Sequence, residues 1–311
     1  MFQKFDKTTI TVLCVLALMA LLLIGLMIRI VDRSSEHVNE IKQTRVVEPT
    51  RLAPSLSGDD DLVNLIINNN PRYPSCIVSD GKLTPAILHK ILAVKNLHEV
   101  WLKRCEFTAA DLQALSVCPL EVIKIEEGNI SEDCMQIISK MPKLRKLEIF
   151  ASDVPPHAMA HLAESKISWL MIHYCLSSKN GGQLTASDLS ILCDMENLMC
   201  LDLERDRFAP GALKGLARSN ISVLNVERCN LTDNDVVDIA KIPKITCVNL
   251  NRNDSVSCRG LKTLLACKNF KTAAFDGDTS NCDLSDDDRK RFGPKLYRVP
   301  AYVWISLKSA N

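Results

Sequence analysis

Residues 224–239 read LNVERCNLTDNDVVDI, and this stretch decides the fold. Leu224 and Val226 alternate with polar residues, as in a strand that buries one face. A small residue, Cys229, follows the strand, and an apolar residue then precedes Thr232, a residue type that favours the helix N-cap position. The stretch therefore predicts a strand, a tight turn and a short helix in direct succession.

The same pattern recurs along the chain at a nearly constant interval, and such self-similarity indicates a repeat architecture. Eight copies begin at Tyr73, Leu97, Leu120, Leu144, Ile167, Leu198, Ile221 and Ile245, which gives intervals of 24, 23, 24, 23, 31, 23 and 24 residues. The long interval contains the polar insertion SSKNGGQ between Leu176 and Leu184, and removing these seven residues restores 24. A degenerate ninth copy begins near Phe270. We therefore expect about nine short repeats.

Each position of the repeat has its own physical role. The ninth place should bond the buried turn backbone, and it holds Cys105, Gly128, Ser152, Cys175, Asp206, Cys229, Asn253 and Asp278. Thr108, Thr185 and Thr232 are expected N-caps, each followed three residues later by an aspartate that can complete a capping box. The helix then buries two apolar residues three apart, such as Leu112 and Leu115.

These residues resemble the short, roughly 24-residue leucine-rich repeats written LxxLxLxxCxLTDxxLxxL, and residues 224–239 match most closely. The likeness covers about residues 73–300 and is nearer to repeats abundant in some environmental bacteria, including planctomycetes, than to the longer ribonuclease-inhibitor type. The resemblance implies an α/β leucine-rich-repeat solenoid, with a curved parallel sheet on the concave side, helices on the convex side, and protein binding on the concave face. It implies no particular partner.

The chain before the repeats predicts a membrane anchor. Residues 10–28 are almost wholly aliphatic and make a helix long enough to cross a bilayer, directly followed by Arg29 and Arg33, whereas a cleaved signal peptide would end in small residues. Basic residues flank both sides, so their count does not choose the orientation. We expect the following segments: a tail (1–9), a transmembrane signal anchor (10–31), a flexible linker (32–57), an N-terminal cap (58–72), the repeats (73–283) and a C-terminal cap (284–311).

The N-terminal cap is expected to contain a short helix, because the acidic run at 59–61 precedes the apolar stretch LVNLII and favours a helix start. The C-terminal segment repeats the N-cap signature at Ser285 and ends in an apolar tail that contains Trp304. This tail is expected to seal the exposed core and edge of the last repeat.

The outward strand positions predict the binding surface. The repeat register places large side chains on the concave face in a chain with only 5% aromatic residues, and such residues often anchor interfaces. The candidate partner-binding residues of this group are Trp101, Phe150, Trp169, Met171 and His173. The alternative is that the insertion or the linker folds over them as a satellite core.

A second candidate surface is acidic. From the fifth repeat onward the outward columns contain no lysine or arginine but hold Asp202, Glu204, Glu227 and Asp276. A basic partner, or weakly bound calcium, would fit there. The alternative is that the adjoining column, which holds Arg205, Arg228 and Arg252, neutralises the acids.

Composition and motifs give no sign of catalysis. The net charge of +1 offers no global attraction for nucleic acid, and no nucleophile elbow, phosphate loop or dinucleotide fingerprint occurs. Glu204 with Glu227 is the one carboxylate pair suited to acid and base chemistry. His157 and His161 have a zinc-binding spacing but lack a third ligand in sequence. We expect no enzyme, no cofactor and no metal.

Thirteen cysteines form an odd, scattered set without a CxxC pair, which argues against a disulfide framework and a structural zinc site. Cys105, Cys175 and Cys229 are expected to be buried, inert thiols, whereas Cys200 and Cys247 fall on outward positions.

The sequence thus predicts a single-pass membrane protein whose repeats bind a protein partner of unknown identity on the concave face. We favour the non-cytoplasmic side for the repeat domain. One alternative is a structural or assembly subunit of a membrane complex, in which the anchor supplies specificity. A further alternative is an enzyme or metal-binding protein.

Overall fold

The computed structural model describes residues 64–152, 154–173 and 183–293. The chain divides into two compact units, Met1–Ser55 and Leu56–Asn311, and every described residue belongs to the second unit. The expected tail, transmembrane anchor and linker, and most of the C-terminal cap, lie outside the described residues. Within the described residues, no helix is both long and apolar enough to cross a membrane.

The described strands form one sheet whose eleven strands follow the order of the sequence. The strands are β1 (Asn64–Asn68), β2 (Ser75–Lys82), β3 (Glu99–Glu106), β4 (Val122–Glu126), β5 (Lys146–Phe150), β6 (Trp169–His173), β7 (Cys200–Asp202), β8 (Val223–Asn225), β9 (Cys247–Asn249), β10 (Thr272–Ala274) and β11 (Phe292–Gly293). All neighbouring pairs are parallel except β1 with β2, which is antiparallel.

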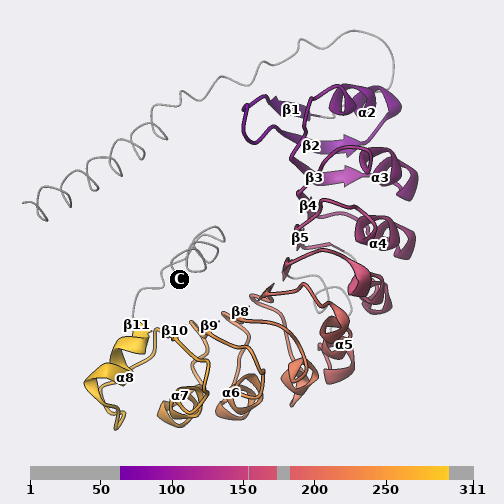
Figure 1. Ribbon diagram of the computed structural model, residues 1–311. Coiled ribbons are helices and arrows are strands. Elements are labelled where there is room, and N and C mark those ends of the chain that lie inside the picture. Colours follow the sequence, from indigo (N-terminus) through magenta and orange to yellow (C-terminus); the bar gives the residue numbers. More distant parts are fainter. Residues whose placement is uncertain (1–63, 153, 174–182, 294–311) are drawn as a thin grey trace, which may run out of the picture. The chain divides into compact units, whose positions relative to one another are not determined.

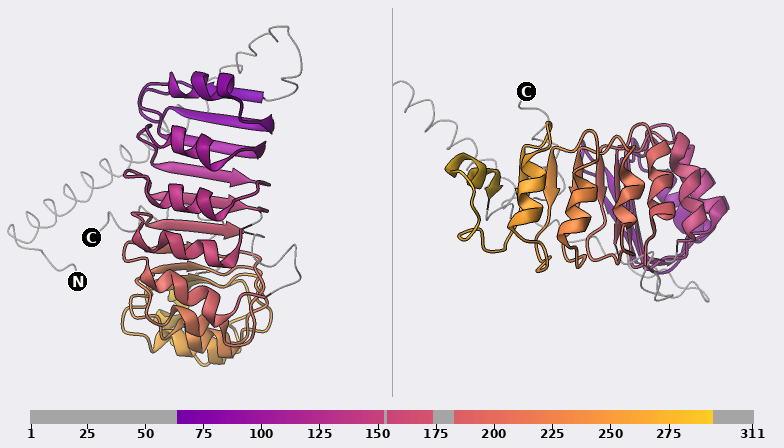
Figure 2. Two further views of the ribbon diagram at one scale, coloured as in Figure 1. Left: turned by 90° about the vertical axis from the view of Figure 1, so that its right-hand side faces the viewer. Right: turned by 90° about the horizontal axis from the view of Figure 1, so that it is seen from below.

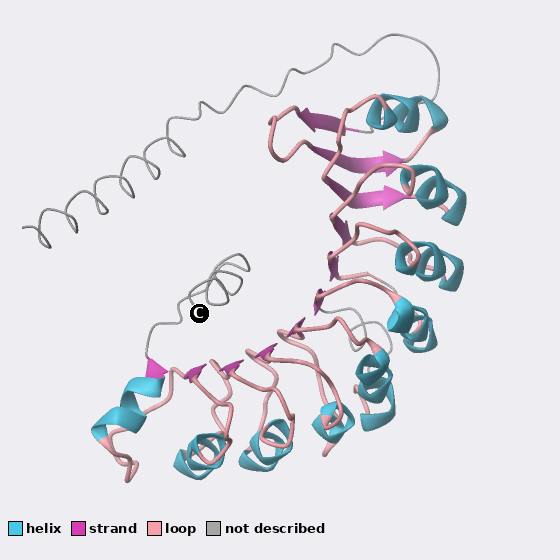
Figure 3. Ribbon diagram, viewed as in Figure 1, coloured by secondary structure: helices cyan, strands magenta, loops and turns pink. Residues whose placement is uncertain are grey.

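Helices connect successive strands and all lie on one side of the sheet, so strands line the inner side of an arc and helices its outer side (Figures 1 and 3). The helices are α2 (Pro85–Leu92), α3 (Ala109–Leu115), α4 (Glu132–Ser139), α5 (Ala186–Ser190), α6 (Asp233–Ile239), α7 (Cys258–Leu265) and α8 (Asp286–Arg291), with 3-10 helices η1 (Pro156–Glu164), η2 (Ile191–Asp194) and η3 (Ala212–Leu216). Views from two further directions show the same stacking of strand and helix layers (Figure 2).

The strand register agrees with the register that the repeats predict. Equivalent positions of successive repeats lie opposite each other on neighbouring strands. One such row across the sheet runs through Glu99, Val122, Lys146, Trp169 and Cys200. Side chains of a strand alternate between the two faces of the sheet, so this register also confirms which strand residues lie on the outward face.

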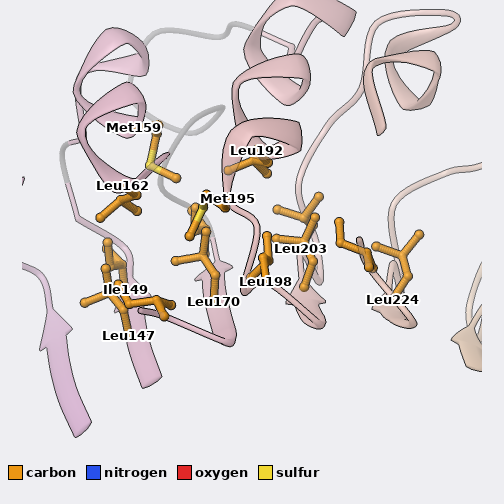
Figure 4. Packing of buried hydrophobic residues seen from close by; sticks show 14 of the residues in the cluster. Leu147, Ile149, Met159, Leu162, Leu170, Leu192, Met195, Leu198, Leu203 and Leu224 are labelled. Atoms are coloured by element: carbon orange, nitrogen blue, oxygen red, sulfur yellow. The ribbon is translucent and has the colours of Figure 1, made fainter. Parts of the chain in front are cut away.

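The hydrophobic core fills the space between the sheet and the helices. Each repeat contributes inward strand residues, such as Leu170 in β6, and inward helix residues, such as Leu162 in η1, all of them fully buried. Figure 4 shows these side chains packing from one repeat to the next, with Leu147 and Ile149 beside Leu170. No repeat can bury its own apolar face, so stability comes from stacking neighbours.

The helix caps follow the prediction. Thr108 accepts a hydrogen bond from the backbone N–H of Asp111, and the Asp111 carboxylate accepts one from the backbone N–H of Thr108. The same reciprocal capping box forms at Thr185 and at Thr232. Two connections form 3-10 helices instead, because η1 begins at consecutive prolines and η3 begins after Gly211, whose φ is +75°.

The ninth place bonds the turn backbone in most repeats. The Asn253 amide oxygen accepts from the N–H groups of Cys229 (3.1 Å) and Leu231 (2.9 Å), and its amide nitrogen donates to the carbonyls of Val226 and Leu250 (both 2.9 Å). Ser152, Cys229 and Asp206 are also buried. Asp278 differs because it is exposed, although its carboxylate still accepts from the backbone N–H of Ser280 (2.7 Å). Cys175 lies outside the described residues.

The N-terminal cap differs from the prediction, because residues 64–68 form strand β1 and not a helix. The sequence NLIIN holds three consecutive apolar residues between two asparagines, and its β-branched isoleucines favour a strand. Leu65 and Ile67 lie on the core side, opposite Val78 and Cys76. Pairing with β2 satisfies the backbone of a segment too short to form a stable helix.

The C-terminal end is closed by α8, β11 and a disulfide bond between Cys258 and Cys282, which are 24 residues apart. Arg289 donates to the carbonyls of Thr279 and Cys282, which fixes the loop against the helix. The sequence argued against a disulfide framework, and among the described residues the structure shows a single cross-link, near the C-terminal end of the repeats. Burial raises the pKa of the Cys105 thiol to about 11 and also raises that of Cys229, as expected for inert thiols.

Candidate functional site

The concave face is defined here as the strand face opposite the helices. Its middle row crosses the sheet through Ile77, Trp101, Lys124, Glu148 and Met171, on strands β2 to β6. These strands have five to eight residues, whereas β7 to β10 have three each. The longer strands present more side chains, so they form the broader part of this face.

Trp101 lies half-buried between two lysines on this surface. The Lys103 and Lys124 ammonium groups lie 5.2 and 5.9 Å from the centroid of its ring, within the range of a cation–π interaction. Its indole nitrogen is buried and has no hydrogen-bond partner among the described residues. The indole is therefore held by cation–π contacts and packing, and its N–H donates no hydrogen bond to the described residues.

Three of the predicted contact residues, Trp169, Met171 and His173, are buried, which corrects the expectation that they meet solvent. Trp169 is only 6% exposed because it packs against Val223 and Cys247, with Cys200 beside them, and because the Lys146 ammonium lies 4.2 Å from the centroid of its ring. Because neighbouring strands are only about 5 Å apart, one large side chain can cover the smaller ones of the same row on the following strands.

His173 is fixed by two neighbours. Its ring lies edge-on to Phe150, with centroids 5.3 Å apart, and its Nε2 is 2.7 Å from Asp202 Oδ1. Burial alone lowers the pKa of the imidazole, but the bond to Asp202 and the nearby carboxylates outweigh burial, so the pKa is raised above its ordinary value. Phe150 itself stays partly exposed.

A lattice of ion pairs fills the space between these large residues. Lys124 Nζ lies 2.8 Å from Glu99 and 3.7 Å from Glu148, and Lys146 also pairs with Glu148. Lys103 pairs with Glu126 at 2.9 Å. All of these residues occupy outward strand positions that the repeat register predicts, but their pairing was not predicted from the sequence. The charges of this surface are thus largely compensated within it.

The acidic surface of the later repeats is also compensated. The arginines of the adjoining column lie next to these acids: Arg205 Nε is 3.1 Å from Glu204, and Arg228 Nε is 3.9 Å from Glu227. Asp276 accepts from the Arg252 side chain (3.2 Å) and from its backbone N–H (2.8 Å). Three of the four acids thus lie beside arginines, in agreement with the alternative that the arginines neutralise them, whereas Asp202 pairs with His173.

In strands β7, β8 and β9 the residue of the middle row is polar, and it is the last residue of its strand. Asp202 Oδ1 accepts from the N–H of Glu204, Asn225 from that of Glu227 and Asn249 from that of Asn251, each at 3.1 Å. Such Asx turns compete with strand pairing and limit each strand to three residues. Asp202 is thus engaged twice, by this turn and by His173.

Ile66 is an exposed residue of the concave face that was not predicted from the sequence. Ile66 lies opposite Ile77, which in turn lies opposite Trp101, so these three form an N-terminal apolar row across β1 to β3. Ile66 is 40% exposed. Nothing in the apolar run of NLIIN marks Ile66 as the residue that faces outward; its register opposite Ile77 does.

No metal or catalytic centre emerges from the described residues, which contain no group of three or more metal-ligating side chains placed to hold an ion. His157 and His161 both bind the exposed carboxylate of Glu132, at 3.3 and 3.0 Å. Burial raises the pKa of Glu204, one member of the candidate carboxylate pair.

Parallel strands at this repeat spacing, helices on one side and a polar turn ladder together define a solenoid protein of leucine-rich-repeat-like fold. No family model and no curated protein matches the chain. Among solved structures, it is similar to a chain of the Toll–Spatzle complex of Drosophila, with a TM-score of 0.42, 14% identity, and coverage of 65% of this chain and 30% of that one. The glycosylated form of that complex matches with a TM-score of 0.42 and 12% identity, over 68% of this chain and 32% of that one. The chain therefore spans about a third of the length of each of these two structures.

Proposed function

We propose that the chain is a membrane-anchored interaction module that binds a protein partner on the concave face of β3 to β6. The observation that supports this most directly is the environment of Trp101, a half-buried indole whose N–H has no partner among the described residues and whose ring lies between two lysines. Indole side chains in such settings anchor interfaces, since they bury a large area at little entropic cost. Phe150 supplies a second, partly exposed anchor two strands away.

The compensated charges around these anchors favour a partner with few net charges at the contact. Lys124 and Glu148 already have ionic neighbours, so a strongly charged partner would have to break pairs before it gained any. Under this proposal Trp101 and Phe150 supply binding energy and the ion-pair lattice supplies selectivity. The acidic residues of the later repeats then have a structural role.

The test is photo-crosslinking of the full chain in native membranes. A photoreactive residue at position 101 is expected to capture a discrete partner, whereas the same residue at Val117, which is 77% exposed on the loop after α3, is not. Trp101→Ala combined with Phe150→Ala should lower partner recovery roughly 30-fold or more, the scale of a lost hot spot. Equal recovery by wild type and double variant overturns the proposal.

Trp169 is left unchanged in this design because it is buried in a cluster and its removal would disturb the sheet. Circular dichroism of the double variant confirms that folding is retained. Replacing residues 10–31 by an unrelated transmembrane helix separates this proposal from an assembly-subunit role, since a concave-face binder retains its partner after the exchange.

The proposal places the repeats on the non-cytoplasmic side of the membrane. The Cys258–Cys282 disulfide supports this, since such bonds persist in oxidising compartments and are rare in the cytosol. Protease treatment of intact cells is expected to cleave the repeat domain, and complete protection would contradict the placement.

We further propose that the protein is not an enzyme and needs no cofactor. A hydrolase activity that Glu227→Gln abolishes would contradict this proposal.

A further inference from the structure

The two edges of the sheet are built differently. At the C-terminal edge, β11 has two residues, follows the basic pair Lys290 and Arg291, and lies beside the loop that the disulfide fixes. Short, charged edges of this kind prevent pairing with another chain. At the N-terminal edge, β1 has five residues, NLIIN, with no charge and no proline.

The outer edge of β1 pairs with no other strand in the described part of the chain, because the sheet order begins with β1. Its central residue, Ile66, is 40% exposed, and Leu65 and Ile67 on the core side are only half-buried. A hollow of about 580 Å³ opens beside Ile67, and its lining combines Ala93 and Val94 with polar residues such as Asn70 and Lys90. The core is therefore less completely covered at this end than at the other.

We propose that β1 is a self-association edge, through which two copies of this chain pair in antiparallel orientation and form a continuous sheet. The sequence of β1 is nearly palindromic about Ile66. Antiparallel pairing on a two-fold axis at this residue sets Ile66 against Ile66 of the second copy, and Asn64 against Asn68. Leu65 of each copy then lies against Ile67 of the other and covers the open core.

The same pairing extends the N-terminal apolar row. Ile66 is continuous with Ile77 and Trp101 in one copy, so the dimer carries one apolar strip of six residues across six strands. No like charges oppose each other at the junction, since Ser75 and Ser79 flank Ile77 on β2 and β1 itself is neutral. A second copy of the chain therefore matches this edge in shape, polarity and charge.

Sedimentation of the full chain in mild detergent tests the association. Wild type is expected to sediment at twice the 34.6 kDa chain mass at micromolar concentration. Ile66→Lys should weaken association about 100-fold, because two buried isoleucines are replaced by facing charges. Val117→Lys, at a more exposed position outside the sheet, should remain dimeric. Since Ile66 is exposed in one copy, the variant is expected to keep the secondary structure of the wild type in circular dichroism.

A cysteine cross-link tests the geometry. Facing residues of an antiparallel pair have Cβ atoms about 5 Å apart, within reach of a disulfide after small adjustment. Under mild oxidation Ile66→Cys should form a covalent dimer at least about tenfold faster than Val117→Cys or wild type. A monomer at all concentrations, which would also result if residues before 64 cover the edge, overturns the proposal. So does a dimer that Ile66→Lys leaves intact.

Discussion

Replacing Asn253 by alanine should be among the most damaging single changes in the solenoid. The side chain is 2% exposed and forms five hydrogen bonds of 2.9 to 3.3 Å with backbone groups of two successive turns. Each such bond contributes about 1 kcal/mol net, and a buried group left without a partner costs about 1–3 kcal/mol. We therefore expect a loss of about 4 kcal/mol, a large fraction of the roughly 5–15 kcal/mol typical of a folded protein.

Urea denaturation followed by tryptophan fluorescence measures this loss, and hydrogen exchange locates it. The amides of Cys229 and Leu231 should lose protection, since both donate to the Asn253 side chain. Asn220→Ala is the matched control: this asparagine is partly exposed and bonds the Glu196 carbonyl and the Lys244 ammonium, so its loss should cost under about 1 kcal/mol. Equal costs for the two variants, or unchanged protection of Leu231, would refute the role assigned to the turn ladder.

Two further perturbations test the site and the C-terminal end. Because the His173 pKa is raised in the folded state, its pairing stabilises the protein fully below about pH 6.5, the ordinary imidazole pKa. This stabilisation should fade as the pH rises through the folded-state pKa; Asp202→Asn should flatten the dependence in thermal melts, and an unchanged pH profile would contradict the pairing. Replacing Cys258 and Cys282 by alanine should cost about 3 kcal/mol in urea denaturation, from the entropy of a loop with a sequence separation of 24, and reductant should then have no further effect on the variant.

The repeat register and the caps were predictable from sequence because both depend on local spacing. The pairing of Glu99 with Val122, and of Lys146 with Trp169, follows once the repeat starts are aligned. The burial of Asn253 follows in the same way, since every turn at that place needs its backbone satisfied.

Other features depend on neighbours that a single repeat does not contain. Trp169 is buried because Val223 and Cys247, two and three strands away, are small enough for its ring to pack against them. The Cys258–Cys282 bond depends on the path of the terminal loop, which no repeat position specifies. Strand β1 was missed because an acidic run and an apolar stretch suit a helix start as well as a strand.

The same side chains explain why the two halves of the concave face differ. In the later repeats the middle row holds Asp202, Asn225 and Asn249, and each uses its side chain to end its own strand. A residue committed to an Asx turn contributes little to a partner, because binding would have to replace a bond that already exists. In the earlier repeats the equivalent positions hold Trp101 and Lys124, whose strands continue beyond them. The proposed binding site is therefore assigned to the longer strands, whose middle-row side chains are not used to end their own strand.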